Sequence, residues 1–97
     1  MERIYEKALR QEFLRNKINF EFQKQIKVKY KDTELGIQQI DFLIEDEIVL
    51  EIKAVSEINN INKAQLISYL KTIDKRVGLV LNFAREKLEI KRVVNKF

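Results

Sequence analysis

The sequence predicts an α/β domain in which a mixed β-sheet is flanked by helices, with the elements in the order α-β-β-β-α-β-β. Apolar residues recur every three or four positions in two segments, as in amphipathic helices. In five other segments they alternate with polar residues or form short runs, as in strands. The second helical segment lies between two strands, so it can cross the sheet and return the next strand parallel to an earlier one.

The first helix is predicted over residues 1–17, and three strands follow it. The apolar residues of the helix fall on one face at positions Ile4, Tyr5, Ala8, Leu9, Phe13 and Leu14. Residues 19–30 alternate instead, which predicts a strand with one face in solvent and with Phe20, Phe22, Ile26, Val28 and Tyr30 on the other. Two more strands are expected over 35–44 and 48–55, after turns at 31–34 and 45–47.

The second half of the chain predicts a helix and two strands. Ser56 or Asn60 is the expected cap of a helix whose apolar positions are Ile61, Ala64, Ile67, Leu70 and Ile73. The apolar run 77–83 is too short for a helix and predicts a buried strand. Residues 87–94 alternate weakly, which favours an edge strand, with a helix as the alternative.

Length and composition limit the classes of protein that this chain can be. Residues 1–97 suffice for a single domain, and no apolar run approaches the roughly 20 residues of a membrane span. Without cysteine or histidine there can be no thiolate or imidazole zinc site and no Ser-His-Asp or Cys-His nucleophile. The lack of cysteine fits a cytoplasmic protein. A net charge of +4 permits a polyanionic partner.

The strand expected over 48–55 carries most of the information about function. Six of its eight residues are apolar, as in a central strand covered on both faces, and only Glu51 and Lys53 interrupt them. Because these two residues are spaced i and i+2, their side chains point to the same side of the sheet. Burying the two charges costs on the order of several kcal/mol unless they are paired, hydrogen-bonded or bound to a metal.

Asp41 is a lone charge in the preceding strand and is the expected partner of this pair. If residues 45–47 form a three-residue hairpin loop, Ile44 faces Ile48 and Asp41 falls directly opposite Glu51. Their Cβ atoms would then be about 5 Å apart on one face of the sheet. Two carboxylates at that distance repel, and one takes a raised pKa unless a divalent cation lies between them.

Mg²⁺ suits such a site because it prefers oxygen ligands, and Lys53 could orient or deprotonate a water there. The alternative is a buried ion pair between Lys53 and Glu51 or Asp41 that has no catalytic role. The residues by themselves support the two interpretations about equally.

Several segments, in order along the chain, carry a resemblance to a known family. They are Glu2–Leu9, Ile40–Asp46, Val49–Val55, Ala64–Lys71, Val77–Phe83 and Lys87–Arg92. Together they resemble the small bacterial GxxExxY proteins, a branch of the PD-(D/E)XK nuclease superfamily, over nearly the whole chain. Two departures are Ile40, where the superfamily's name has proline, and Ala84, where glycine is expected.

This resemblance implies a restriction-endonuclease-like fold and a nuclease that hydrolyses DNA, with RNA as the second choice, using Mg²⁺ or Mn²⁺. Asp41, Glu51 and Lys53 would be catalytic, and Glu2 would join the two carboxylates as a metal ligand. Other residues would contact or support the nucleic acid: Tyr5, Gln65, Tyr69, Asn82, Arg85, Lys87, Lys91 and Arg92. For each of these, an ordinary structural role as a core aromatic or a solvated polar group stays open.

Two other classes of function stay open at this stage. A non-catalytic nucleic-acid-binding or assembly module could keep the nuclease fold without needing Mg²⁺ or Lys53, and a structural partner domain would bind no nucleic acid. The edge segment 88–94 and the small core favour a homodimer slightly over a monomer, because unpaired edge groups can be satisfied by a second copy.

Overall fold

The computed structural model describes residues 2–84 and 86–96, and the side chains of all of these except Lys29 and Tyr30. Two helices and five strands follow the predicted order. They are α1 (Glu2–Arg15), β1 (Phe20–Tyr30), β2 (Thr33–Ile44), β3 (Ile48–Lys53), α2 (Asn60–Ile73), β4 (Val77–Asn82) and β5 (Glu89–Val94). Residues 89–94 form a strand, so the helical alternative for this segment is wrong.

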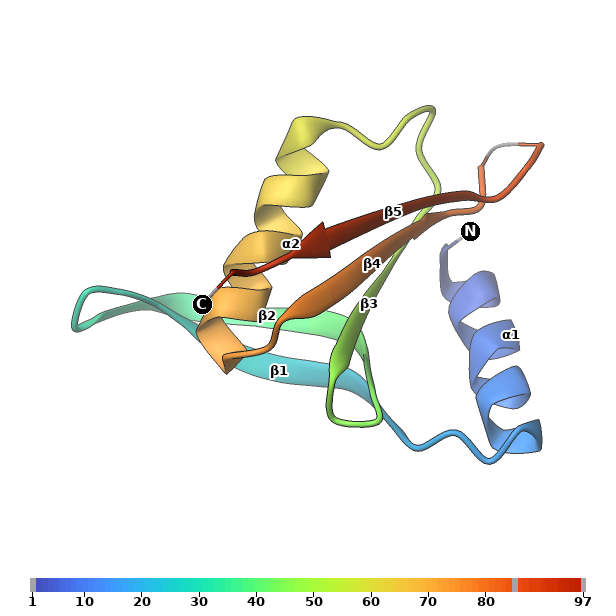
Figure 1. Ribbon diagram of the computed structural model, residues 1–97, viewed down its shortest axis with the longest axis horizontal. Helices are drawn as coiled ribbons and strands as arrows, with labels where there is room; N and C mark the ends of the chain where they lie inside the picture. Colours follow the sequence, from blue (N-terminus) through green and yellow to red (C-terminus); the bar gives the residue numbers. More distant parts are fainter. Residues whose placement is uncertain (1, 85, 97) are drawn as a thin grey trace.

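The five strands form one mixed sheet in the order β1-β2-β3-β4-β5 (Figure 1). Strands β1, β2 and β3 form an antiparallel meander, α2 crosses over, and β4 returns parallel to β3, as predicted. Strand β5 pairs antiparallel with β4 and forms one edge of the sheet. The loop 45–47 sets Ile44 opposite Ile48, which confirms the predicted register.

The two helices cover opposite faces of the sheet (Figure 1), and each face has its own apolar cluster. The α2-side cluster includes Leu66, Tyr69 and Leu70 of the helix. The α1-side cluster is centred on Phe42, Leu50, Ile52 and Leu81, with half-buried aromatic and aliphatic residues of α1 packed against it. Strand β3 contributes to both clusters, and this explains why four of its six residues are apolar, on both faces.

Helix α2 lies very close to β4, and its beginning is fixed by side-chain hydrogen bonds. A Cβ atom on Gly78 would lie 2.8 Å from Leu66, so the glycine allows the helix to approach the strand. The helix cap is Asn59, whose side chain accepts the Asn62 N–H while the Asn62 side chain accepts the Asn59 N–H. The prediction of Ser56 or Asn60 as the cap was therefore wrong, because Asn59 and Asn62 form the reciprocal capping pair.

Strands β1 and β2 extend beyond the other strands as a two-stranded arm (Figure 1). Their side-chain alternation reverses near Gln23, which has a positive φ of 53°. Phe22 packs in the α1-side cluster, whereas Ile26 packs in the α2-side cluster. On β2, Phe42 and Ile40 are divided between the clusters in the same way. The prediction that the apolar residues of β1 share one face was therefore wrong, because the left-handed backbone at Gln23 turns the residues that follow it to the other face within the continuous strand.

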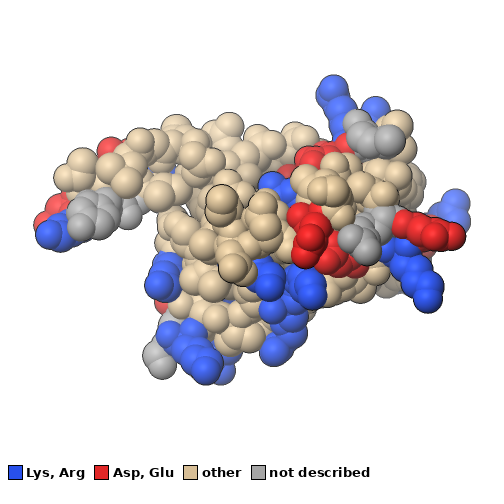
Figure 2. Space-filling model, turned by 90° about the horizontal axis from the view of Figure 1, so that it is seen from above, with Lys and Arg blue, Asp and Glu red and all other residues tan. Residues whose placement is uncertain are grey.

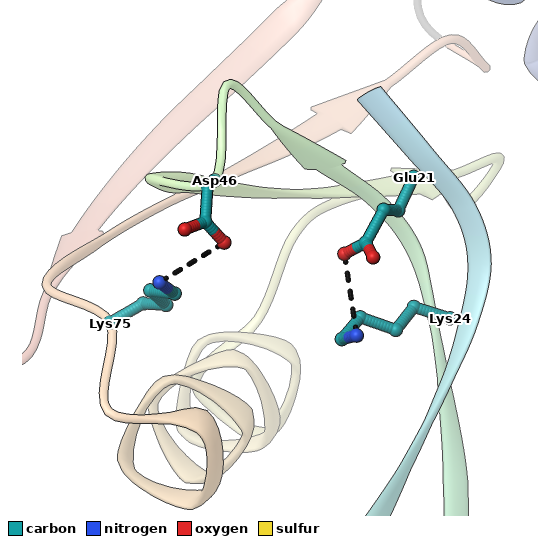
Figure 3. Close-up of polar contacts among 4 residues, drawn as sticks. All are labelled: Glu21, Lys24, Asp46 and Lys75. Carbon is teal, nitrogen blue, oxygen red and sulfur yellow. Dashed lines mark ion pairs between the residues drawn. The ribbon is translucent and has the colours of Figure 1, made fainter. Parts of the chain in front are cut away.

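Two ion pairs are seen away from the carboxyl end of β3 (Figure 3). Lys75, just after α2, lies 3.3 Å from Asp46 in the β2–β3 loop, and Lys24 lies 3.3 Å from Glu21 within β1. Both are partly exposed, so each contributes at most about 1 kcal/mol. Neither helix is long and apolar enough to cross a membrane, as far as the described residues go.

Candidate active site

The candidate site lies where β2 and β3 separate. Their backbone pairing covers Phe42 to Ile44 of β2 and stops there. At the next position of this register, Asp41 and Glu51, side-chain hydrogen bonds take the place of the backbone hydrogen bonds between the strands. The Ile52 N–H donates to Asp41 Oδ2 at 2.7 Å, and the Asp41 N–H lies 3.4 Å from its acceptor, Glu51 Oε1. Asp41 and Glu51 are thus brought together between the two strands, as the predicted register required.

Glu51 is almost fully buried at this point, with 7% of its surface exposed. It shares a sheet face with Val49, which packs in the α2-side cluster, and with Lys53, which is half-buried. Burial, followed by the charge and the hydrogen bond of Asp41, raises the pKa of Glu51 to about 9, and Lys53 only partly opposes this shift. The repulsion expected between the two carboxyl groups is therefore present.

Helix α1 adds a carboxyl group that sequence reasoning missed. The side chain of Glu6 shares a hydrogen bond with Asp41. Partial burial, this hydrogen bond and the charges of Asp41 and Glu2 raise the pKa of Glu6 to about 7, while Arg10 lowers it. A usable signal was in the sequence: Glu2, Glu6 and Arg10 are spaced i, i+4 and so follow one stripe of the helix.

Glu2, the first-helix glutamate of the sequence analysis, is held at the carboxyl end of β3. Its Oε2 accepts the Ala54 N–H at 3.1 Å, one residue after Lys53. Glu2, Glu6, Asp41 and Glu51 therefore form a carboxylate cluster that joins α1, β2 and β3. We use that name for these four residues below.

Two residues of α2, Gln65 and Tyr69, were expected to contact or support the nucleic acid, and the structure places them in different surroundings. Tyr69 is buried, and its hydroxyl donates to Gln38 Oε1 at 3.4 Å. Burial raises the pKa of Tyr69, and the charges of Glu51 and Asp41 add to the effect, which places its ring near the carboxylate cluster. Gln65 is exposed one helical turn earlier.

Asn82 and Tyr5 are used inside the fold. Asn82 is fully buried, and its amide accepts the Val55 N–H at 3.1 Å and donates to the Val55 carbonyl at 2.8 Å and to Glu89 Oε1 at 2.9 Å. Of the contacting and supporting roles expected for Asn82, only the supporting one fits this geometry. Tyr5 stacks on Phe83 with ring centroids 4.4 Å apart and so fastens α1 to the end of β4.

The basic residues near the end of the chain do not form one surface. Lys91 pairs with Val80, which faces α2, whereas Arg92 pairs with Leu79, which faces α1. The two cations are exposed on opposite faces of the sheet. Lys87 is exposed in the preceding loop, and Arg85 lies outside the described residues.

The largest group of acidic side chains on the face seen in Figure 2 lies at the end of the molecule opposite the arm.

In the described ranges, no three Asp, Glu, His or Cys side chains converge in the geometry of a metal site. Asp41 and Glu2 each direct one oxygen at a backbone N–H. What the arrangement offers chemically is four carboxyl groups from three elements, two of them with raised pKa values, and a lysine on the same sheet face as Glu51.

Comparisons with known proteins agree with this architecture. The crystal structure of SSO0001 superposes with a TM-score of 0.73 at 18% sequence identity, over 97% of this chain and 50% of that one. The likeness is one of fold, and the chain spans about half the length of that structure. No curated protein matches the sequence. A family model described as the PD-(D/E)XK nuclease superfamily matches residues 1–93, and the chain therefore belongs to that superfamily.

Proposed function

We propose that this protein is a metal-dependent nuclease that hydrolyses phosphodiester bonds in DNA, with RNA as the less favoured substrate. The observation that carries the proposal is the carboxylate cluster, in which Asp41 interacts with both Glu6 and Glu51. Two of its members, Glu51 and Glu6, have strongly raised pKa values, first because they are buried and then because Asp41 lies beside them. Raised values of this kind, produced by burial and by specific charged neighbours, are typical of functional sites.

The donor set fits Mg²⁺, and Mn²⁺ as an alternative. Both are hard cations that take carboxylate oxygens, and no sulfur or imidazole is available to select zinc. Asp41 and Glu51 would hold the ion, with Glu6 and Glu2 as further ligands from α1. Bound there, the ion would supply Lewis acidity toward the phosphodiester and toward water.

The remaining roles follow from where the side chains lie. Lys53 is on the same sheet face as Glu51 and is half-buried, so it can orient the attacking water and hold its proton. Tyr69 closes the α2 side of the cluster and donates to Gln38, which supports it as a positioning residue. Exposed lysines and arginines, Lys87 among them, would contact the phosphate backbone and carry little base specificity.

Within the superfamily, we place the chain in the GxxExxY branch, on the segments from Glu2 to Arg92 that resemble it. We also propose that residues 1–97 form a single nuclease domain. The lack of cysteine supports a cytoplasmic location.

One assay tests the proposal directly. Purified protein is incubated with linear, circular and single-stranded DNA and with RNA, in Mg²⁺, Mn²⁺ or chelator. We expect cleavage of DNA that needs the metal and is lost in Asp41→Asn. The matched control is Asp74→Asn, an exposed aspartate at the left-handed C-cap of α2, where asparagine is well tolerated.

The same assay separates the rival functions. Binding to nucleic acid without any metal-dependent cleavage would support a non-catalytic module that keeps the fold. Failure to bind DNA or RNA under every condition would support a structural partner domain.

A symmetric dimer along β5 is a further part of the proposal. This strand is a sheet edge, and Ile90 on it is 54% exposed, so pairing with a second copy would cover both backbone groups and apolar surface. Light scattering over a range of concentrations tests it, and a mass that stays near 11.6 kDa throughout would exclude the dimer.

A further inference from the structure

Arg10 follows Glu2 and Glu6 along the same stripe of α1 and ends beside the carboxylate cluster. Its guanidinium carbon lies 4.0 Å from the centroid of the Phe22 ring. That ring in turn packs against Phe42, with centroids 5.4 Å apart, and Phe42 directly follows Asp41. The arginine is therefore half-buried and held on an aromatic platform next to the site.

One donor of the guanidinium has no hydrogen-bond partner among the described residues. That donor is the Nε, which is buried. Arg10 lowers the pKa of Glu6 through its charge, but the side chain of Glu6 is hydrogen-bonded to Asp41. Buried donors are normally paired, and this one is not, so the side chain is held here by the Phe22 ring and by charge, and a ligand would meet the guanidinium at its terminal nitrogens.

We propose that Arg10 binds a backbone phosphate of the nucleic acid immediately beside the carboxylate cluster. A phosphodiester is repelled by the ionised members of the cluster, and a fixed cation at the edge of the cluster offsets that repulsion. A guanidinium suits the task because its planar donors match two phosphate oxygens at once. This inference rests on the proposed function, since it assumes a nucleic-acid substrate.

The contact with Phe22 favours an arginine over a lysine at this position. The ring holds the guanidinium in place before the ligand arrives, so less side-chain freedom is lost on binding. The contact involves only the phosphate, so it positions the strand and reads no bases. The competing role is that of a counterion for Glu6, which would affect the folded protein and leave nucleic-acid binding unchanged.

The test compares Arg10→Gln and Arg10→Lys with wild type, with Arg15→Gln as the matched control. Arg15 is on the same helix and is exposed, so Arg15→Gln removes one positive charge from the helix without disturbing the contact between Arg10 and Phe22. Binding of a fluorescent duplex is measured by anisotropy at several salt concentrations, with Ca²⁺ in place of Mg²⁺ and a gel to verify that the duplex stays intact. Melting temperatures verify that each variant is folded.

We expect Arg10→Gln to bind about tenfold more weakly, and its plot of log affinity against log salt to be shallower by about one unit. Arg10→Lys should restore the salt slope but only part of the affinity, because a lysine keeps the charge and loses the two-point contact. In Mg²⁺, KM should rise in Arg10→Gln while kcat changes less than about twofold, as for a contact made equally in the ground and transition states.

The outcomes separate this inference from the proposed function. Wild-type cleavage combined with unchanged binding and salt slope in Arg10→Gln would overturn the role of Arg10 and leave the nuclease intact. Equal losses in Arg10→Gln and Arg15→Gln would also overturn it, because they would indicate general charge alone. Weakened binding in a protein that never cleaves would uphold Arg10 and refute the nuclease. Wild-type protein that binds no nucleic acid would refute both.

Discussion

The stability of the metal-free protein should fall as the pH rises, and Glu51 should be the main cause. Its pKa is about 9 in the folded protein, against 4.5 for an ordinary glutamate. The folded state therefore binds one more proton than the unfolded state between these two values. The slope of the free energy of unfolding against pH is proportional to the number of protons bound in the unfolded state minus the number bound in the folded state. Because the folded state binds more protons here, that slope is negative. This contribution is complete below about pH 4.5 and is lost as the pH rises through 9.

The size of this change in the free energy of unfolding follows from the difference between the two pKa values of Glu51. Each unit of pKa difference corresponds to about 1.4 kcal/mol, so the whole window represents on the order of 5 kcal/mol. The shift of Glu6, to about 7, acts in the same direction. A small domain with a stability of about 5–10 kcal/mol would lose a large share of it at alkaline pH.

Urea denaturation in chelator at pH 5, 6, 7, 8 and 9 measures this slope. Glu51→Gln reproduces the protonated side chain, so it should match wild type at pH 5, be clearly more stable at pH 9 and show a much shallower slope. Glu47→Gln, an exposed glutamate in the β2–β3 loop, should behave like wild type. The reasoning would be refuted by wild-type stability that rises over this range, or by an equal slope in Glu51→Gln.

Three further predictions concern the site and its support. Mg²⁺ should raise the melting temperature of wild type, since it binds only the folded arrangement, and Asp41→Ala should abolish the shift; a full shift in the variant would remove Asp41 from the ligands. Lys53→Met should keep the fold and its stability but lower cleavage by roughly 10²-fold or more, whereas near-normal cleavage would mark Lys53 as structural. Asn82→Ala should lower the free energy of unfolding in urea by about 3 kcal/mol, because it leaves both backbone groups of Val55 without partners. A variant of normal stability with weakened DNA binding would instead indicate a direct contact by Asn82.

The order of the elements and the pairing of Asp41 with Glu51 could be predicted because both follow from local patterns. An apolar run interrupted at i and i+2 identifies a buried strand, and a three-residue loop sets the register between neighbours. Both inferences depend only on periodicity and on the length of one turn, so they hold whatever the rest of the chain does.

Other features depended on tertiary structure and could not be predicted in this way. The reversal of faces in β1 arises from one left-handed residue, Gln23, which no turn sequence announces. Glu6 joins the cluster because Tyr5 and its neighbours set the rotation of α1 on the sheet. Asn82 is a polar residue of a type usually found at the surface, but here it is fully buried, and its amide oxygen and nitrogen both form hydrogen bonds with Val55.

The separation of β2 from β3 also bears on how such a site can decay in evolution. The Asp41 side chain accepts the N–H of Ile52 in β3, and the Glu51 side chain accepts the N–H of Asp41 in β2. Each position therefore supports the sheet as well as the cluster. A descendant that lost its nuclease activity would still need acceptors there, and asparagine and glutamine would provide them without mutual repulsion. Selection for folding alone would therefore replace the acids by their amides. Two carboxyl groups at these positions are a costlier choice, and a bound cation gives a reason to keep them.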